Sequence, residues 1–83
     1  MQYQMSSKLL INNISKELNT LSDLIIKNDS LQINLEHVDH IDSAGIALFI
    51  ELKQIAQTHG KNISFINSTS SITKLCQLYQ VNL

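Results

Sequence analysis

The most constraining feature of the sequence is the stretch 31–55, in which a short alternating segment leads through a polar loop into a helix. Apolar and polar side chains alternate at its start, as in a strand with one covered face: Leu31, Ile33 and Leu35 against Gln32 and Asn34. The helix begins at Asp42 or Ser43, because either side chain can accept a hydrogen bond from a free backbone N–H of the first turn. These features predict a strand–loop–helix unit at the centre of the chain.

That helix has two unequal faces at about 100° per residue. One face is apolar and is predicted to pack on the core: Gly45, Leu48, Phe49, Leu52, Ile55 and Ala56. Gly45 also lets another backbone, or a partner, come close. The opposite face is polar, but Ile46, Ala47 and Ile50 lie on it next to Ser43, and a group of exposed apolar residues beside a helix start predicts a docking surface. The alternative is that a neighbouring loop covers Ile46 and Ile50.

The flanking segments predict further strands and helices. A strand is expected near Tyr3–Met5, a helix over about Leu9–Ile26 from its apolar spacing, and another strand over Asn62–Asn67. The central helix should stop at Gly60. A last amphipathic helix presents an apolar face to the core: Ile72, Leu75, Cys76 and Tyr79. The order of elements predicts one α/β domain, 1–83, with three helices and a mixed sheet of about three to four strands, in which strands joined through a helix are parallel.

Composition excludes several classes of function. All six basic residues are lysine and the net charge is −1, so no basic stripe and no arginine are present to bind nucleic acid. The single cysteine, Cys76, cannot form an internal disulfide and is expected in a reducing compartment. No apolar run is long enough to span a membrane, and no signal peptide is recognisable. We therefore expect a cytoplasmic protein that reaches a membrane only through a partner.

Residue types used in catalysis occur here without the spacing that catalysis needs. His37 and His40 form a single H-x-x-H pair with no matching second pair, so no metal site is predicted. Ser43, His40 and Asp42 include the residue types of a catalytic triad, but near neighbours in sequence rarely reach its geometry. Capping is the better interpretation of Asp42 and Ser43, and Cys76 is most simply a small core residue. We expect neither enzymatic activity nor a cofactor.

The segment V-D-H-I-D-S-A-G-I-A-L, residues 38–48, resembles the STAS domain family. The family pattern is a strand ending in a turn that opens a helix, and five residues match it: Ile41, Asp42, Ser43, Gly45 and Ile46. The likeness covers residues 31–83, whereas residues 1–30 match in helical pattern only. It implies a STAS-type fold in which the two leading strands are shortened or lost, because only about eight residues precede Leu9. An exposed sheet edge would then favour self-association.

One position separates two functions within the family. Members that switch partners by phosphorylation carry the acceptor Ser or Thr directly before the motif glycine, where this chain has Ala44. The D-[ST]-A-G form is similar instead to the MlaB group, cytoplasmic subunits of ABC-type phospholipid transporters that maintain outer-membrane lipid asymmetry. This similarity implies a non-enzymatic subunit that binds and stabilises a MlaF-like ATPase at the inner membrane. The similarity places Ser43 at the contact with the ATPase, beside the apolar residues predicted to form the docking surface. The expected partner-binding residues therefore lie at the helix start: Asp42, Ser43, Ala44, Ile46, Ala47 and Ile50. The alternative is an anti-sigma factor antagonist regulated by phosphorylation.

Overall fold

The main sheet has three strands in the order β1-β3-β5 in the computed structural model, which describes residues 1–83. Its strands are β1 (Gln2–Gln4), β3 (Ser30–Asn34) and β5 (Asn62–Ile66). Both neighbouring pairs are parallel, since a helix returns the chain to the same end of the sheet each time. Two further short strands, β2 (Lys8–Leu9) and β4 (His40–Ile41), pair in parallel as a separate sheet. The α/β class is confirmed, and all the strand pairs are parallel.

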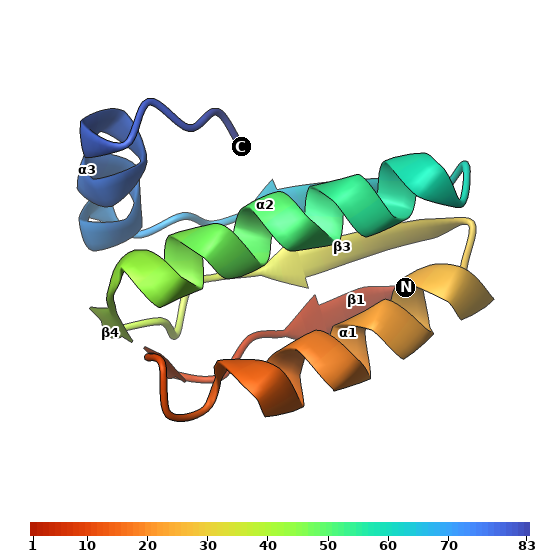
Figure 1. The fold of residues 1–83 in the computed structure, drawn as a ribbon, viewed down its shortest axis with the longest axis horizontal. Helices are drawn as coiled ribbons and strands as arrows, with labels where there is room; N and C mark the ends of the chain where they lie inside the picture. The colour runs from red at the N-terminus through yellow and green to blue at the C-terminus, as the bar shows by residue number, and fades with distance from the viewer.

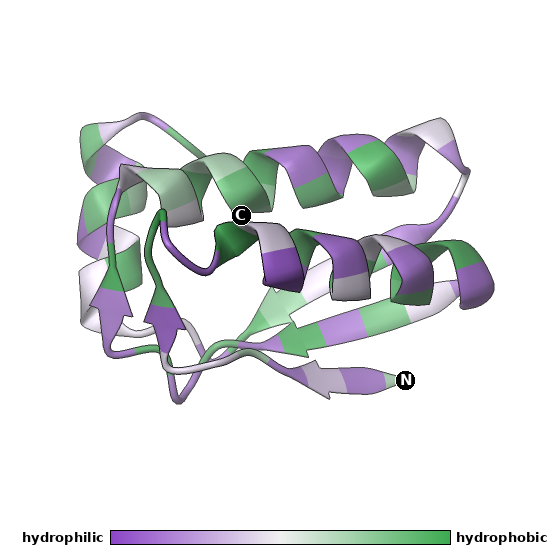
Figure 2. Ribbon diagram, turned by 60° about the horizontal axis from the view of Figure 1, so that its bottom comes forward, coloured by the Kyte–Doolittle hydropathy of each residue, from purple (hydrophilic) through white to green (hydrophobic).

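Three helices accompany the strands: α1 (Ile14–Lys27), α2 (Ser43–Thr58) and α3 (Ser70–Leu78). The first two lie side by side over one face of the main sheet, and α3 stands at the end of the molecule where α2 begins (Figures 1 and 2). The other face carries exposed, uncharged polar residues: Gln2, Gln4, Ser30, Gln32, Asn62 and Ser64. None of the helices is both long and apolar enough to cross a bilayer.

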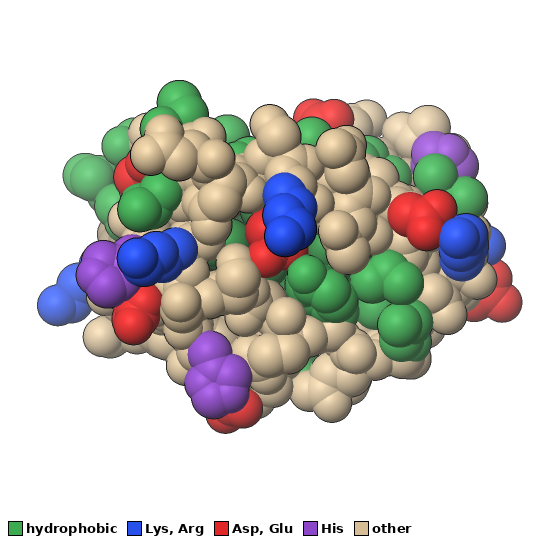
Figure 3. Space-filling model, turned by 90° about the horizontal axis from the view of Figure 1, so that it is seen from below, with side chains coloured by type: hydrophobic (Ala, Val, Ile, Leu, Met, Phe, Trp, Pro, Cys, Tyr) green, Lys and Arg blue, Asp and Glu red, His purple; other side chains and the backbone are tan.

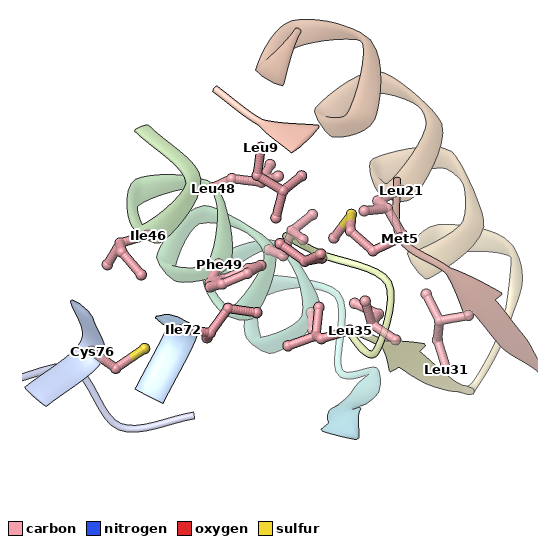
Figure 4. Packing of buried hydrophobic residues seen from close by; sticks show 14 of the residues in the cluster. Met5, Leu9, Leu21, Leu31, Leu35, Ile46, Leu48, Phe49, Ile72 and Cys76 are labelled. Carbon is pink, nitrogen blue, oxygen red and sulfur yellow. The ribbon is translucent and has the colours of Figure 1, made fainter. Parts of the chain in front are cut away.

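The hydrophobic core lies between α1, α2 and the covered face of the main sheet. Leu31 and Ile33 of β3 and Leu35 directly after it are buried, which confirms the predicted apolar face of this segment. Phe49 of α2 packs on Phe65 of β5 with ring centroids 5.1 Å apart. Figure 4 shows side chains from the strands, α2 and α3 converging on this core. The predicted apolar face of α2 is confirmed, with its members buried or, for one, half-buried: Gly45, Leu48, Phe49, Leu52, Ile55 and Ala56.

One buried amide holds the ends of two strands together. Asn34 is only 6% exposed, although the alternation placed it on the open face. Its Oδ1 accepts from the backbone N–H of Glu36 at 3.0 Å and from the Nδ2 of Asn67 at 3.3 Å. Asn67 has φ +58, a left-handed conformation that asparagine tolerates, and it ends β5. Asn34 is thus buried but satisfied, as buried polar groups generally are.

A carboxylate is buried between α1 and β1. Glu17 is 8% exposed, and its Oε2 accepts a hydrogen bond from the Tyr3 hydroxyl at 2.7 Å. Burial, and then the hydrogen bond to Glu17, raise the pKa of Tyr3 to about 12. The pair anchors β1, a strand of three residues, to the first helix.

The first helix starts later than predicted. Residues 8–9 extend as β2 instead of opening a helix at Leu9, because they pair with β4. The Asn13 side chain then closes the turn before α1, since it accepts from the Leu10 N–H at 2.9 Å and donates to the Lys8 carbonyl. The leading strands are therefore short but present. The predicted end of α2 is confirmed. The helix ends at Thr58, His59 is its C-cap, and Gly60 follows with φ +66.

Candidate functional site

Asp42 joins the start of α2 to the turn between β2 and α1. Its Oδ1 accepts from the Ala44 N–H at 2.9 Å, which confirms Asp42 as the N-cap. Its Oδ2 accepts from the Ile11 N–H at 3.4 Å, and its own N–H donates to the Leu9 carbonyl at 3.3 Å. One side chain therefore fixes both the first turn of α2 and the loop that faces it.

Gly45 allows the close approach of these segments. A Cβ at this position would lie 2.9 Å from the Leu9 carbonyl oxygen and 2.6 Å from the Cγ1 of Ile41. Both distances are below normal contact distance, so a larger residue would push β2 and β4 away from the helix. The predicted close backbone approach at Gly45 is confirmed.

A shallow apolar groove runs along the first half of α2. It has a volume of about 290 Å³, and we call it the α2 groove; it is lined by Ser43, Ile46, Ala47, Ile50, Tyr79 and Val81. Ser43 and Ala47 are exposed, and Ile50 keeps 50% of its surface in solvent. Ala44 is half-buried beside them. The structure thus brings the predicted residues together at the start of α2, but not all of them are exposed to solvent.

The prediction that Ile46 is exposed is wrong. Ile46 is only 3% exposed and belongs to the hydrophobic core. Figure 4 shows its side chain on the side of α2 that faces α3 and Cys76. The helical period alone put Ile46 on the polar side, but the segment after α3 returns along α2 and covers that side. The alternative of a covering segment is therefore correct for Ile46 and not for Ile50.

Tyr79 and its neighbours were missed as surface residues. Tyr79 was predicted to face the core, yet it is the C-cap of α3 and 49% exposed. The two most exposed large apolar side chains are Ile11 at 75% and Leu78 at 71%. Nothing in the periodicity of α3 marks Tyr79 as exposed, because its spacing from Ile72 and Cys76 suits a core position.

One hydrogen bond closes the turn after α3, and a second ties the C-terminal segment to α2. The Val81 N–H donates to the Cys76 carbonyl at 2.8 Å, and the Lys53 Nζ donates to the Asn82 carbonyl at 2.7 Å. Gln80 has φ +58, which turns the chain back after α3. The groove is therefore built from the helix start and from a segment about 35 residues further along the chain.

The side chains considered for catalysis do not assemble a reactive site. His37 and His40 are both exposed, and no group of three His, Cys, Asp or Glu side chains could hold a metal ion. His40 contacts Asp39, with 2.7 Å between Nδ1 and Oδ1, and no hydrogen bond joins it to Ser43. Burial raises the pKa of the Cys76 thiol, which keeps it protonated. Charged side chains are scattered over the face seen in Figure 3, without a patch of one sign.

The comparisons with known proteins identify the family. The STAS domain model matches residues 1–82. Among solved structures, the anti-sigma factor antagonist SpoIIAA in its unphosphorylated form superposes with a TM-score of 0.79 at 15% identity, covering 96% of this chain and 71% of that chain. The Bacillus cell fate determinant SpoIIAA in its phosphorylated form gives 0.74 at 15% identity, covering 94% and 72%. No curated protein matches the chain. The chain belongs to the STAS domain family.

Proposed function

We propose that this STAS domain is a non-enzymatic accessory subunit that binds and stabilises the ATPase of an ABC-type phospholipid transporter. In this role it lies in the cytoplasm and reaches the inner membrane only through the complex. The observation that carries the proposal is Ala44, which stands at the start of α2 where partner-switching relatives carry a hydroxyl. A permanent subunit needs a docking surface there but no phosphate acceptor.

The surface beside Ala44 suits a stable protein contact. The α2 groove is lined mainly by apolar residues, and Ile50 and Tyr79 are each about half exposed at its rim. Apolar and aromatic residues of this kind commonly dominate the binding energy of protein interfaces. The groove residues carry no formal charge, so we expect binding to depend mainly on burial and only weakly on salt.

Co-purification with a co-expressed MlaF-like ABC-type ATPase tests the proposal. We expect Ile50→Asp to abolish binding while the domain stays folded, because Ile50 contributes little to the core and its new charge would be buried at the interface. Gln54→Asp is the matched control, since Gln54 is an exposed residue of the same helix outside the α2 groove. Circular dichroism on the same samples establishes that each variant is folded.

Ser43→Asp tests the first turn separately. Aspartate next to a helix N-terminus interacts favourably with its dipole, so stability should stay the same or rise. If Ser43 lies in the interface, binding should fall although the melting temperature does not. Normal binding by both Ser43→Asp and Ile50→Asp would show that the partner does not dock at the start of α2.

The second candidate is an anti-sigma factor antagonist regulated by phosphorylation. The fold similarity to SpoIIAA favours it, and the exposed Ser43 offers a hydroxyl one residue before the expected acceptor position. Intact mass after incubation with ATP and an anti-sigma-type kinase distinguishes the candidates. We expect no change, whereas a stoichiometric gain of one phosphate that disappears in Ser43→Ala would favour the phosphorylation switch.

A further inference from the structure

We propose that the free edge of β5 pairs with β5 of a second copy, in antiparallel orientation, to give one continuous sheet across the dimer. The strand order β1-β3-β5 leaves β5 outermost, with a neighbour on one side only (Figure 1). An unpaired edge is a template for adding another strand. The self-association expected from the N-terminal strands is thereby assigned to the opposite edge of the sheet.

The backbone of β5 shows which residues are free to pair. The Asn62 N–H donates to the Asp29 carbonyl at 3.0 Å, and the Ile66 carbonyl accepts from the Leu35 N–H at 2.9 Å. Asn62 and Ile66 therefore turn their backbone groups toward β3, as does Ser64 between them by the alternation of a parallel ladder. Ile63 and Phe65 turn theirs outward, and no hydrogen bond from another loop or cap reaches them.

These outward groups are self-complementary about Ser64. In an antiparallel pair centred there, Ile63 faces Phe65 of the second copy and Phe65 faces its Ile63. Each facing pair exchanges two backbone hydrogen bonds, about four in all. Ser64 faces Ser64 of the second copy across the two-fold axis of the dimer. The two residues form a non-hydrogen-bonded pair, with Cα atoms roughly 4.5 Å apart.

The strand itself lacks the charged residues and prolines by which proteins usually prevent such pairing. No charged residue occurs from Asn62 to Ser71, and the chain contains no proline. No like charges would therefore meet in the centre of the paired strands. The other edge is less suited, because β1 has only three residues, whereas β5 has five.

The structure also leaves room beside this edge. A hollow of about 320 Å³ separates β5 from the second half of α2 and is lined by Lys53, Ala56, Gln57, Lys61, Asn62 and Ile63. Ile63 and Phe65 are half-buried, so a second copy would cover apolar surface that solvent now reaches. None of these residues lines the α2 groove, and the dimer does not depend on the proposed function.

Charged substitutions at Ser64, on the two-fold axis of the dimer, test the proposed pairing of the two β5 strands. We expect the wild-type chain to form a dimer of about twice its 9.4 kDa mass at high concentration in sedimentation equilibrium. Ser64→Glu and Ser64→Lys should each weaken dimerisation at least tenfold, because two like charges then face each other. A mixture of the two variants should restore it. The control is Gln32→Glu, which lies beside Ser64 on the same open face but about 14 Å from its counterpart in the dimer.

A crosslink tests the register. Ser64→Cys should form an intermolecular disulfide under mild oxidation, whereas Gln32→Cys should not, because only position 64 comes within disulfide distance of itself. A wild-type chain that stays monomeric at millimolar concentration would overturn the proposal. A dimer that persists unchanged in both charged variants at position 64 would also overturn it, because the interface would then lie elsewhere.

Discussion

Gly45→Ala should destabilise the domain, although alanine is the better helix former. Gly45 lies in the first turn of α2, where the substitution by itself would favour the helix by about 1 kcal/mol. The new methyl group would, however, lie 2.9 Å from the Leu9 carbonyl oxygen and 2.6 Å from the Ile41 side chain. The Ile41 side chain can rotate, but the Leu9 carbonyl is backbone and accepts a hydrogen bond from the Asp42 N–H.

Overpacking of this kind costs about 1–3 kcal/mol. After the gain in helix propensity of about 1 kcal/mol is subtracted, the expected net loss in the free energy of unfolding is about 1 kcal/mol. For a domain of this size, that loss corresponds to a decrease in Tm of about 4–8 °C. Thermal and urea unfolding followed by circular dichroism would measure both quantities.

Two further variants separate the causes. Ala47→Gly changes helix propensity at an exposed position of α2 and should cost about 1 kcal/mol without any clash. Ile41→Ala combined with Gly45→Ala should cost less than the sum of the single changes, because the methyl group then meets fewer atoms. A Gly45→Ala domain with a Tm above that of the wild type would refute the reasoning, since propensity would then outweigh the contact with Leu9.

Three other outcomes are expected. Asp42→Ala should lower the free energy of unfolding by about 1–2 kcal/mol, measured by urea titration, because the first turn of α2 loses its cap. The wild-type domain should lose stability as pH rises from 10 toward 12, because the folded state holds the Tyr3 proton that the unfolded chain releases. Tyr3→Phe, which cannot titrate or bond to Glu17, should show a smaller loss over that range in denaturation at fixed pH. Ile46→Asp should unfold the domain and Ile50→Asp should not, as judged by circular dichroism, because only Ile46 is buried.

Local patterns predicted much of the fold because local physics determines it. The alternation in β3, the cap at Asp42 and the stop at Gly60 each depend on a few neighbouring residues and are confirmed. The predicted start of α1 was wrong, because Leu9 forms part of a strand that pairs with Ile41, a residue distant in sequence. Helical spacing in the N-terminal segment could not reveal that competition.

The site was predicted less well, for the same reason. Asp42, Ser43 and Ala47 lie where the sequence placed them, at the start of one helix. Ile46 is buried because α3 and the segment after it cover that side of α2. Tyr79 is half exposed at the end of α3, where the chain turns back at Gln80. A helical wheel treats each helix alone, so it cannot show which of two apolar residues a distant segment covers.

The α2 groove exists only when the segment after α3 lies along α2, where the Lys53 Nζ donates to the Asn82 carbonyl. One wall comes from α2 and the other from Tyr79 and Val81, so the isolated helix would present only half of the surface. A partner that binds in this groove would distinguish a finished domain from a nascent or partly unfolded chain. A peptide copied from α2 should accordingly compete poorly for any partner that binds in this groove.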